Sequence, residues 1–140
     1  MTRTFVITGS ASGIGQSTAH KLKSLGNTVI GVDIHNADVI ADLSTHGGRI
    51  QAAEKAIAAS NNSIDAIIAC AGLAHPTAAT VSVNYFGVTE FINELLPTLS
   101  QSKTPRVAIT SSVASIMPNS SELVEAMCAN DEGKAVEIAQ

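Results

Sequence analysis

The stretch Thr4-Phe5-Val6-Ile7-Thr8-Gly9-Ser10-Ala11-Ser12-Gly13-Ile14-Gly15 decides the fold of this chain. Its first five residues are mostly apolar or β-branched and too few for a helix, so they predict a buried strand. Three glycines among the next seven residues predict a tight loop. Ala19, Leu22 and Leu25 then follow at helical spacing, and Gly26-Asn27 is a typical helix end. The sequence therefore begins with a strand that leads through a glycine loop into a helix.

The alternation of strands and helices continues along the chain. Further strands are predicted over residues 28–33, 39–41, 64–70 and 106–110, and helices over residues 49–59 and 81–99. Pro97 is expected to kink or end the second of these helices. Apolar strands that alternate with helices imply right-handed crossovers and a parallel sheet covered on both faces. We therefore predict an α/β protein with a Rossmann-type doubly wound sheet of about five strands in the order 3-2-1-4-5.

The glycine loop has the spacing that a dinucleotide requires. Gly9 allows the turn, Gly13 lets a pyrophosphate approach the backbone, and Gly15 lets the helix pack closely. Free N–H groups at the helix N-terminus then face the phosphates. Asp33 ends the next strand, where a carboxylate accepts hydrogen bonds from ribose hydroxyls and repels a 2′-phosphate. The pattern predicts NAD rather than NADP; the alternative is that the glycines only turn the chain and Asp33 is solvated.

Composition excludes several other classes of function. The net charge is −4, Trp is absent and aromatic residues make up 3%, so no nucleic-acid partner is expected. Two cysteines and four histidines lack the spacing of a disulfide scaffold or a metal site, so no metal is expected. The longest apolar stretch, 66–74, is about half a membrane span, and the N-terminus lacks a signal peptide. We therefore expect a cytoplasmic protein that does not act on membranes.

Five motifs, in this order, resemble the short-chain dehydrogenase/reductase family. They are Thr8–Gly15, similar to the pattern TGxxxGIG; Asp42-Leu43; Cys70-Ala71-Gly72, with Cys in place of the usual Asn; Val83–Gly87; and Ser111–Ser115. The resemblance extends over essentially the whole chain. Within the family, the sequence is most similar to a bacterial hydroxysteroid dehydrogenase/carbonyl reductase subgroup.

The resemblance implies an oxidoreductase that interconverts an alcohol and a ketone. The substrate would be a 3-hydroxysteroid or another carbonyl compound, and the protein would be a homo-oligomer. Ser112 would hydrogen-bond the substrate oxygen, and Asn84 would hold a water of the proton relay through its backbone. The implied NAD-binding residues are Gly9, Ser10, Ala11, Ser12, Gly13, Ile14, Gly15, Asp33, Ile34, Asp42, Leu43, Cys70, Ala71 and Gly72.

The sequence departs from the family at its general acid and base. The family uses a Tyr with a Lys four residues later, because a nearby ammonium lowers the pKa of the phenol toward neutrality. No Tyr follows Ser112; the only one, Tyr85, has Thr89 four residues later and is expected to pack in a helix. We therefore expect a chain truncated before this motif, with little or no turnover alone.

The expected domain boundaries follow from the family resemblance and from the expected truncation. Residues 1–112 are expected to form the NAD-binding domain, and residues 113–140 a helical segment that resembles an insertion in the subgroup, with helices over residues 122–129 and 133–139. The strand at 106–110 would then be an open sheet edge, unless the terminal helices fold over it. Two alternatives remain for function: a non-catalytic NAD-binding module, and a pairing partner of a full-length subunit.

Overall fold

A five-stranded parallel sheet forms the centre of the molecule. The structure is a computed structural model that describes residues 1–140. Its strands are β1 (Thr4–Thr8), β2 (Thr28–Asp33), β3 (Val39–Ile40), β4 (Ala66–Ala69) and β5 (Arg106–Ile109). They lie in the order β3-β2-β1-β4-β5, and every neighbouring pair is parallel. The predicted doubly wound α/β fold is confirmed.

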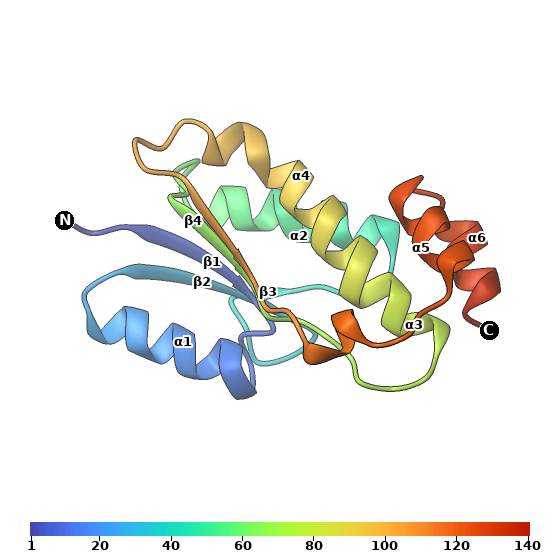
Figure 1. Cartoon of the computed structure of the whole chain (residues 1–140). Coiled ribbons are helices and arrows are strands. Elements are labelled where there is room, and N and C mark those ends of the chain that lie inside the picture. The colour runs from blue at the N-terminus through green and yellow to red at the C-terminus, as the bar shows by residue number, and fades with distance from the viewer.

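Helices cover both faces of this sheet (Figure 1). The helical elements are α1 (Gly13–Ser24), α2 (His46–Ala59), α3 (Ala78–Val81), the π-helical turn η1 (Ser82–Phe86), α4 (Gly87–Leu99), the 3₁₀ turn η2 (Val113–Ile116), α5 (Ser121–Cys128) and α6 (Glu132–Ile138). Helix α1 lies against one face, and α2 and α4 lie against the other, while α5 and α6 stand at one end beside α3 (Figure 1).

Two apolar clusters fill the space between the sheet and these helices. Val6 and Ile67 pack with Phe91 of α4 on one face, and Ile7 packs with Ala19 of α1 on the other. Neighbouring residues of a strand point to opposite faces, and both faces of β1 are covered. This double coverage explains why β1 is apolar at consecutive positions instead of alternating.

The start of α2 and the length of β4 differ from the prediction. Helix α2 begins at His46 rather than at residue 49, because the Thr45 hydroxyl accepts a hydrogen bond from the Gly48 N–H at 3.1 Å. Gly47-Gly48 concealed this start, since glycine is a poor helix former. The strand expected over residues 64–70 is shorter, and β4 forms only at Ala66–Ala69.

The predicted helix 81–99 contains an irregular turn. It consists of α3, η1 and α4 in succession, begins at Ala78 rather than at residue 81, and has its π turn centred on Asn84. Pro97 does not end the helix, which continues to Leu99. Pro97 has no N–H to donate to the carbonyl four residues earlier, so α4 lacks one backbone hydrogen bond there but does not end.

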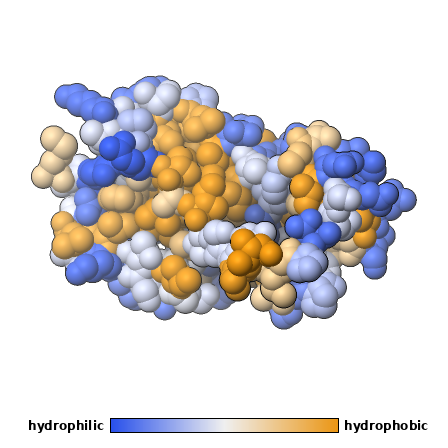
Figure 2. All heavy atoms as spheres, in the orientation of Figure 1, coloured by the Kyte–Doolittle hydropathy of each residue, from blue (hydrophilic) through white to orange (hydrophobic).

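The last two helices do not cover the open sheet edge. Ala126 of α5 and Ala135 of α6 pack with Phe86 of η1 in a separate apolar cluster. All four residues of β5 remain exposed, including Val107 and Ile109. Figure 2 shows hydrophobic side chains on this face, where β5 and η2 lie in Figure 1. The alternative that the terminal helices fold over the edge is therefore wrong. None of the helices combines the length and apolar character that crossing a bilayer would need.

Candidate dinucleotide site

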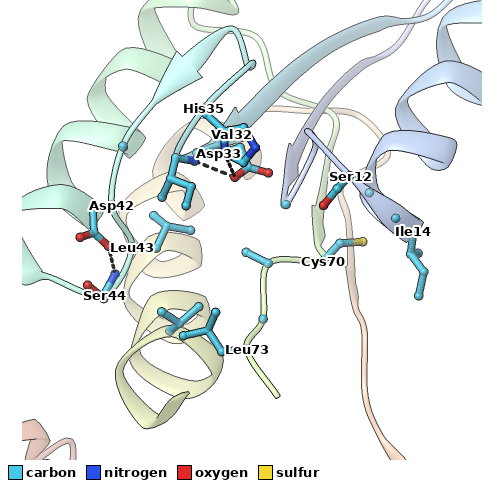
Figure 3. A pocket seen from close by; sticks show the side chains of 18 of the residues that line it. Ser12, Ile14, Val32, Asp33, His35, Asp42, Leu43, Ser44, Cys70 and Leu73 are labelled. Atoms are coloured by element: carbon cyan, nitrogen blue, oxygen red, sulfur yellow. Dashed lines mark hydrogen bonds and ion pairs between the residues drawn. The ribbon is translucent and has the colours of Figure 1, made fainter. Parts of the chain in front are cut away.

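A cavity of about 640 Å³ opens at the carboxyl ends of the central strands. This is the edge at which a doubly wound sheet binds its ligand, on both sides of the point where strand order reverses. Of the predicted cofactor residues, all except Ser10 and Ala11 line this cavity. Figure 3 shows Ile14 and Cys70 on one side of it, Asp42 and Ser44 on the other, and Asp33 between them. The structure thus brings together motifs spread over more than half of the chain.

The glycine loop leaves backbone open toward this cavity. Gly9 has φ +67°, and a Cβ there would lie 2.7 Å from the Ala71 nitrogen, so only glycine fits. Gly13 has φ +54°, yet a Cβ there would meet nothing within 4 Å. The space beside Gly13 is therefore free for a ligand to approach the backbone, which fits a pyrophosphate.

The N-terminus of α1 is available to an anion. Ser12 precedes the helix in an extended conformation, and its side chain makes no capping hydrogen bond. The first turn of α1 has no acidic residue, while Lys21 and Lys23 lie in the last turn. The partial positive charge and unpaired N–H groups of a helix N-terminus favour a phosphate at this position.

Ser10 and Ala11 shape the loop instead of lining the cavity. The Ser10 hydroxyl is buried without a hydrogen-bond partner, and it lies so close to Gly31 that a Cβ on that glycine would be 2.4 Å from it. The Ala11 N–H donates a hydrogen bond of 2.9 Å to Oδ2 of Asp33. Together with a hydrogen bond of 3.4 Å from the Ser10 N–H to the Val32 carbonyl, this bond fixes the loop to β2 and its end.

Asp33 connects the glycine loop to the end of β2, where it lines the cavity. Besides Ala11, its carboxylate accepts a hydrogen bond of 2.7 Å from the Ile34 N–H through Oδ1. Its side chain is 14% exposed, and His35 Nδ1 lies 3.9 Å from Oδ1. Each carboxylate oxygen has two acceptor sites, so capacity remains for hydroxyl donors in the cavity.

The segment 42–44 forms the opposite wall. The Asp42 carboxylate accepts a hydrogen bond of 2.9 Å from the Ser44 N–H. Hydrogen bonds from the side chain and backbone of Ser44 lower the pKa of Asp42 below its ordinary value. Asp42 therefore stays ionised at neutral pH, and it holds the turn that presents Leu43 to the cavity (Figure 3).

The third wall follows β4 and is fixed by side chains from neighbouring elements. The Thr8 hydroxyl accepts hydrogen bonds of 3.2 Å from the N–H groups of both Cys70 and Ala71. Asn84 binds the backbone of Leu73 twice, with its Oδ1 2.7 Å from the Leu73 nitrogen and its Nδ2 2.9 Å from the Leu73 oxygen. The side chain of Asn84 thereby fixes the loop that forms this wall.

The two predicted catalytic residues lie outside the cavity lining. Ser112 is exposed, and its hydroxyl accepts a hydrogen bond of 3.2 Å from Ala114 at the start of η2. Asn84 is exposed in η1 and directs its side chain to Leu73. Tyr85 packs edge-to-face on Phe86 with the ring centroids 5.1 Å apart, so it is a packing residue as predicted.

Several cavity residues were not identified from the sequence. They are Val32, His35, Ala41, Ser44, Leu73, Ala79 and Val83. Most directly adjoin a predicted residue, so extending each motif by one position would have found them. Ala79 carries no signal of its own, because it enters the cavity through the fold of α3. No three His, Cys, Asp or Glu side chains are grouped in a way that could hold a metal ion.

The sequence pattern of a known family matches most of this chain. The pattern is described as "short chain dehydrogenase" and matches residues 3–124.

The chain belongs to the short-chain dehydrogenase family.

One relative is a 3-alpha-hydroxysteroid dehydrogenase/carbonyl reductase from Comamonas testosteroni, which is 41% identical over 140 residues. That match covers 96% of this chain and 54% of the relative, so the chain spans about half the length of the enzyme it matches.

Solved structures agree with this assignment. The 3-alpha-hydroxysteroid dehydrogenase from Pseudomonas sp. B-0831, complexed with NADH, is 41% identical, with a TM-score of 0.92 over 97% of this chain and 60% of that one. A 3-ketoacyl-(acyl-carrier-protein) reductase from Brucella melitensis, also complexed with NADH, is 21% identical, with a TM-score of 0.71 over 97% of this chain and 66% of that one. The second match shows the fold alone.

Proposed function

We propose that the cavity binds NAD, and that the protein is the cofactor-binding part of an NAD-dependent oxidoreductase. The observation that carries the proposal is the single cavity in which the open backbone at Gly13, the Asp33 carboxylate and the segment 42–44 meet. Pyrophosphate would lie at the N-terminus of α1, and the adenosine would lie between Asp33 and Leu43. The NADH in the related Pseudomonas structure supports the same class of cofactor.

Asp33 provides the preference for NAD over NADP. The carboxylate accepts hydrogen bonds from the ribose hydroxyls, whereas a 2′-phosphate would bring a second negative charge beside it. No Arg or Lys lines the cavity to compensate that charge. NADP would therefore bind more weakly than NAD.

The reaction would interconvert a secondary alcohol and its ketone. Bound NAD supplies the acceptor or donor of a hydride. Ser112 accepts the Ala114 N–H through its oxygen, so its hydroxyl hydrogen is free to bind the oxygen of a substrate. The two related hydroxysteroid dehydrogenases favour a steroid or another carbonyl compound as substrate.

Turnover by these 140 residues alone would be low or absent. No Tyr-x-x-x-Lys pair follows Ser112, and Tyr85 packs against Phe86 away from the cavity lining. The packing of Tyr85, the only Tyr among these residues, against Phe86 favours a second candidate, a non-catalytic NAD-binding module. Steroid oxidation by the purified chain, followed as NADH absorbance, would contradict both statements.

Calorimetric titration with NAD and NADP tests the proposed cofactor. The original chain should bind NAD more tightly than NADP. Asp33→Ala should weaken NAD binding by about 1–3 kcal/mol, because hydrogen bonds to a charged group are lost, and it should narrow the difference between the two cofactors. Glu54→Gln is a suitable control, since Glu54 is exposed on α2 and carries the same charge. Unchanged NAD affinity in Asp33→Ala would refute the role of Asp33, and absence of NAD binding by the original chain would refute the function.

A further inference from the structure

Arg49 is a fully buried cation behind the wall of the cavity. It lies in the first turn of α2, and its side chain is 0% exposed. Burial disfavours the charged guanidinium, but hydrogen bonds to Glu132 and Glu90 outweigh this cost and raise the pKa of Arg49. Removing one partner of such a buried charge is costly, because the remaining charge is left uncompensated.

One end of this network holds the backbone of the cavity wall. Arg49 Nε donates to the Leu43 carbonyl at 2.7 Å, and Nη2 donates to the Ser44 carbonyl at 3.1 Å. Leu43 and Ser44 both line the cavity. Gly48 lets α2 approach the segment closely, because a Cβ at this position would lie 1.9 Å from the backbone carbonyl oxygen of Asp42. The segment 42–44 is thus packed and hydrogen-bonded against the start of α2.

The other end of the network reaches the last helix of the chain. Glu132 begins α6 and accepts two hydrogen bonds from Arg49, with its Oε2 2.6 Å from Nη1 and its Oε1 2.7 Å from Nη2. Glu90 of α4 accepts a single one at 2.9 Å. Bidentate pairing fixes a guanidinium in orientation as well as in position. Nη2 also donates to the Ser82 carbonyl at 3.1 Å. Helix α6 therefore helps to set the direction in which Arg49 presents its N–H groups to Leu43 and Ser44, and Glu132 supplies two of the hydrogen bonds that do so.

We infer that Arg49 and Glu132 are positioning residues through which the terminal helices order the adenosine side of the cavity. The inference rests on the proposed function, since it takes the ligand of segment 42–44 to be the adenosine of NAD. Loss of the Glu132 carboxylate would leave the guanidinium held by Glu90 and the Ser82 carbonyl, so it would shift toward them and loosen its hold on the carbonyls of Leu43 and Ser44. Ordering this segment would then have to occur on binding, which weakens affinity.

The test compares Glu132→Gln and Glu132→Asp with the original chain. Glu137→Gln is the matched control, because Glu137 is exposed on the same helix. Hydrogen exchange at the Ser44 and Thr45 amides reports the order of the segment without any nucleotide. Titrations with AMP and with nicotinamide mononucleotide report the two halves of the ligand separately.

We expect Glu132→Gln to accelerate exchange at Ser44 and Thr45 and to weaken AMP binding on the order of fivefold. Binding of nicotinamide mononucleotide should not change. Glu132→Asp keeps the charge, so its exchange rates and AMP affinity should lie between those of the original chain and those of Glu132→Gln. If Glu132→Gln does not fold, Glu132→Asp alone gives the same comparison.

Two results would overturn the inference. One is exchange at Ser44 and Thr45 equal to that of the original chain; the other is faster exchange spread equally over β1 and α1, which would indicate general destabilisation. An original chain that binds no AMP would refute the proposed function instead, because the exchange measurement does not depend on nucleotide.

Discussion

Strands β4 and β5 are neighbours in one sheet and differ completely in burial. They pair in parallel, with Ile67 opposite Val107 and Ala69 opposite Ile109. Ile67 is 0% exposed, whereas Ile109 is 56% exposed. β4 has a partner on each side and lies under α4, while β5 has a partner only on its β4 side.

An apolar β-branched segment is often expected both to form a strand and to be buried. The contrast between β4 and β5 shows that these two properties are separate. Pairing with β4 satisfies backbone groups on one side of β5 and is enough to make it a strand. Burial needs a further layer of side chains, which β4 has and β5 does not. The stability of the fold should therefore depend on β4 far more than on β5.

Truncating one side chain in each strand gives the largest expected effect. Ile67→Ala should lower the free energy of unfolding by about 2–5 kcal/mol, because it leaves a cavity in the main core. Ile109→Ala should change it by about 0.5 kcal/mol or less, since that side chain is already solvated. Denaturation with urea measures both values. Equal losses would show that β5 is covered in solution.

Acid should act on the anchored start of β4. The Asp65 carboxylate accepts hydrogen bonds from the Ser102 hydroxyl at 2.6 Å and the Thr4 N–H at 2.8 Å, and these lower the pKa of Asp65. The stabilisation is complete above the ordinary pKa of 3.8 and is lost as the pH falls through the lowered value. Asp65→Asn should cost about 1 kcal/mol at neutral pH and flatten the pH dependence of unfolding below pH 4.

The control for this experiment is Glu54→Gln, which removes an exposed carboxylate that makes no hydrogen bond in the structure. Its acid profile should match that of the original chain. An Asp65→Asn profile just as steep as the original would show that other carboxylates dominate acid unfolding. Glu132, whose pKa the Arg49 hydrogen bonds lower, is the first of these to consider.

The smallest effect on stability is expected at the open edge itself. Val107→Lys with Ile109→Lys should change the free energy of unfolding by about 0.5 kcal/mol or less per site. The same changes should reduce concentration-dependent self-association, because charged side chains block pairing between exposed strands. Sedimentation velocity measures this. Ile40→Lys, at the two-residue edge strand β3, is the control and should leave self-association unchanged.

The central fold was predictable because its signals are local. A few neighbouring residues are enough to predict the structural role of the apolar run at 4–8, of the glycine loop and of Asp33. The cavity follows from them, since parallel strands bring their carboxyl ends to one edge. Ser10 and Ala11, which were predicted to bind the cofactor, do not line the cavity, and a motif does not reveal which way each side chain turns.

Long-range contacts were not predictable in the same way. The burial of Arg49 depends on Glu90 and Glu132, which lie 41 and 83 residues away along the chain. A lone Arg in a helix normally indicates a solvated face. The position of the terminal helices was likewise hidden, because small residues such as Ala126 and Ala135 do not indicate which partner they will meet.

The bond between Asp33 and Ala11 has a kinetic consequence. The Asp33 carboxylate holds the glycine loop in place before any nucleotide binds, so the loop does not have to fold around an incoming nucleotide. Association should then be a single step whose observed rate rises linearly with nucleotide concentration, as stopped-flow fluorescence of NADH would record. Asp33→Ala removes the hydrogen bond to the loop as well as those to the ribose. The fluorescence trace of that variant alone should therefore show a second, slower phase.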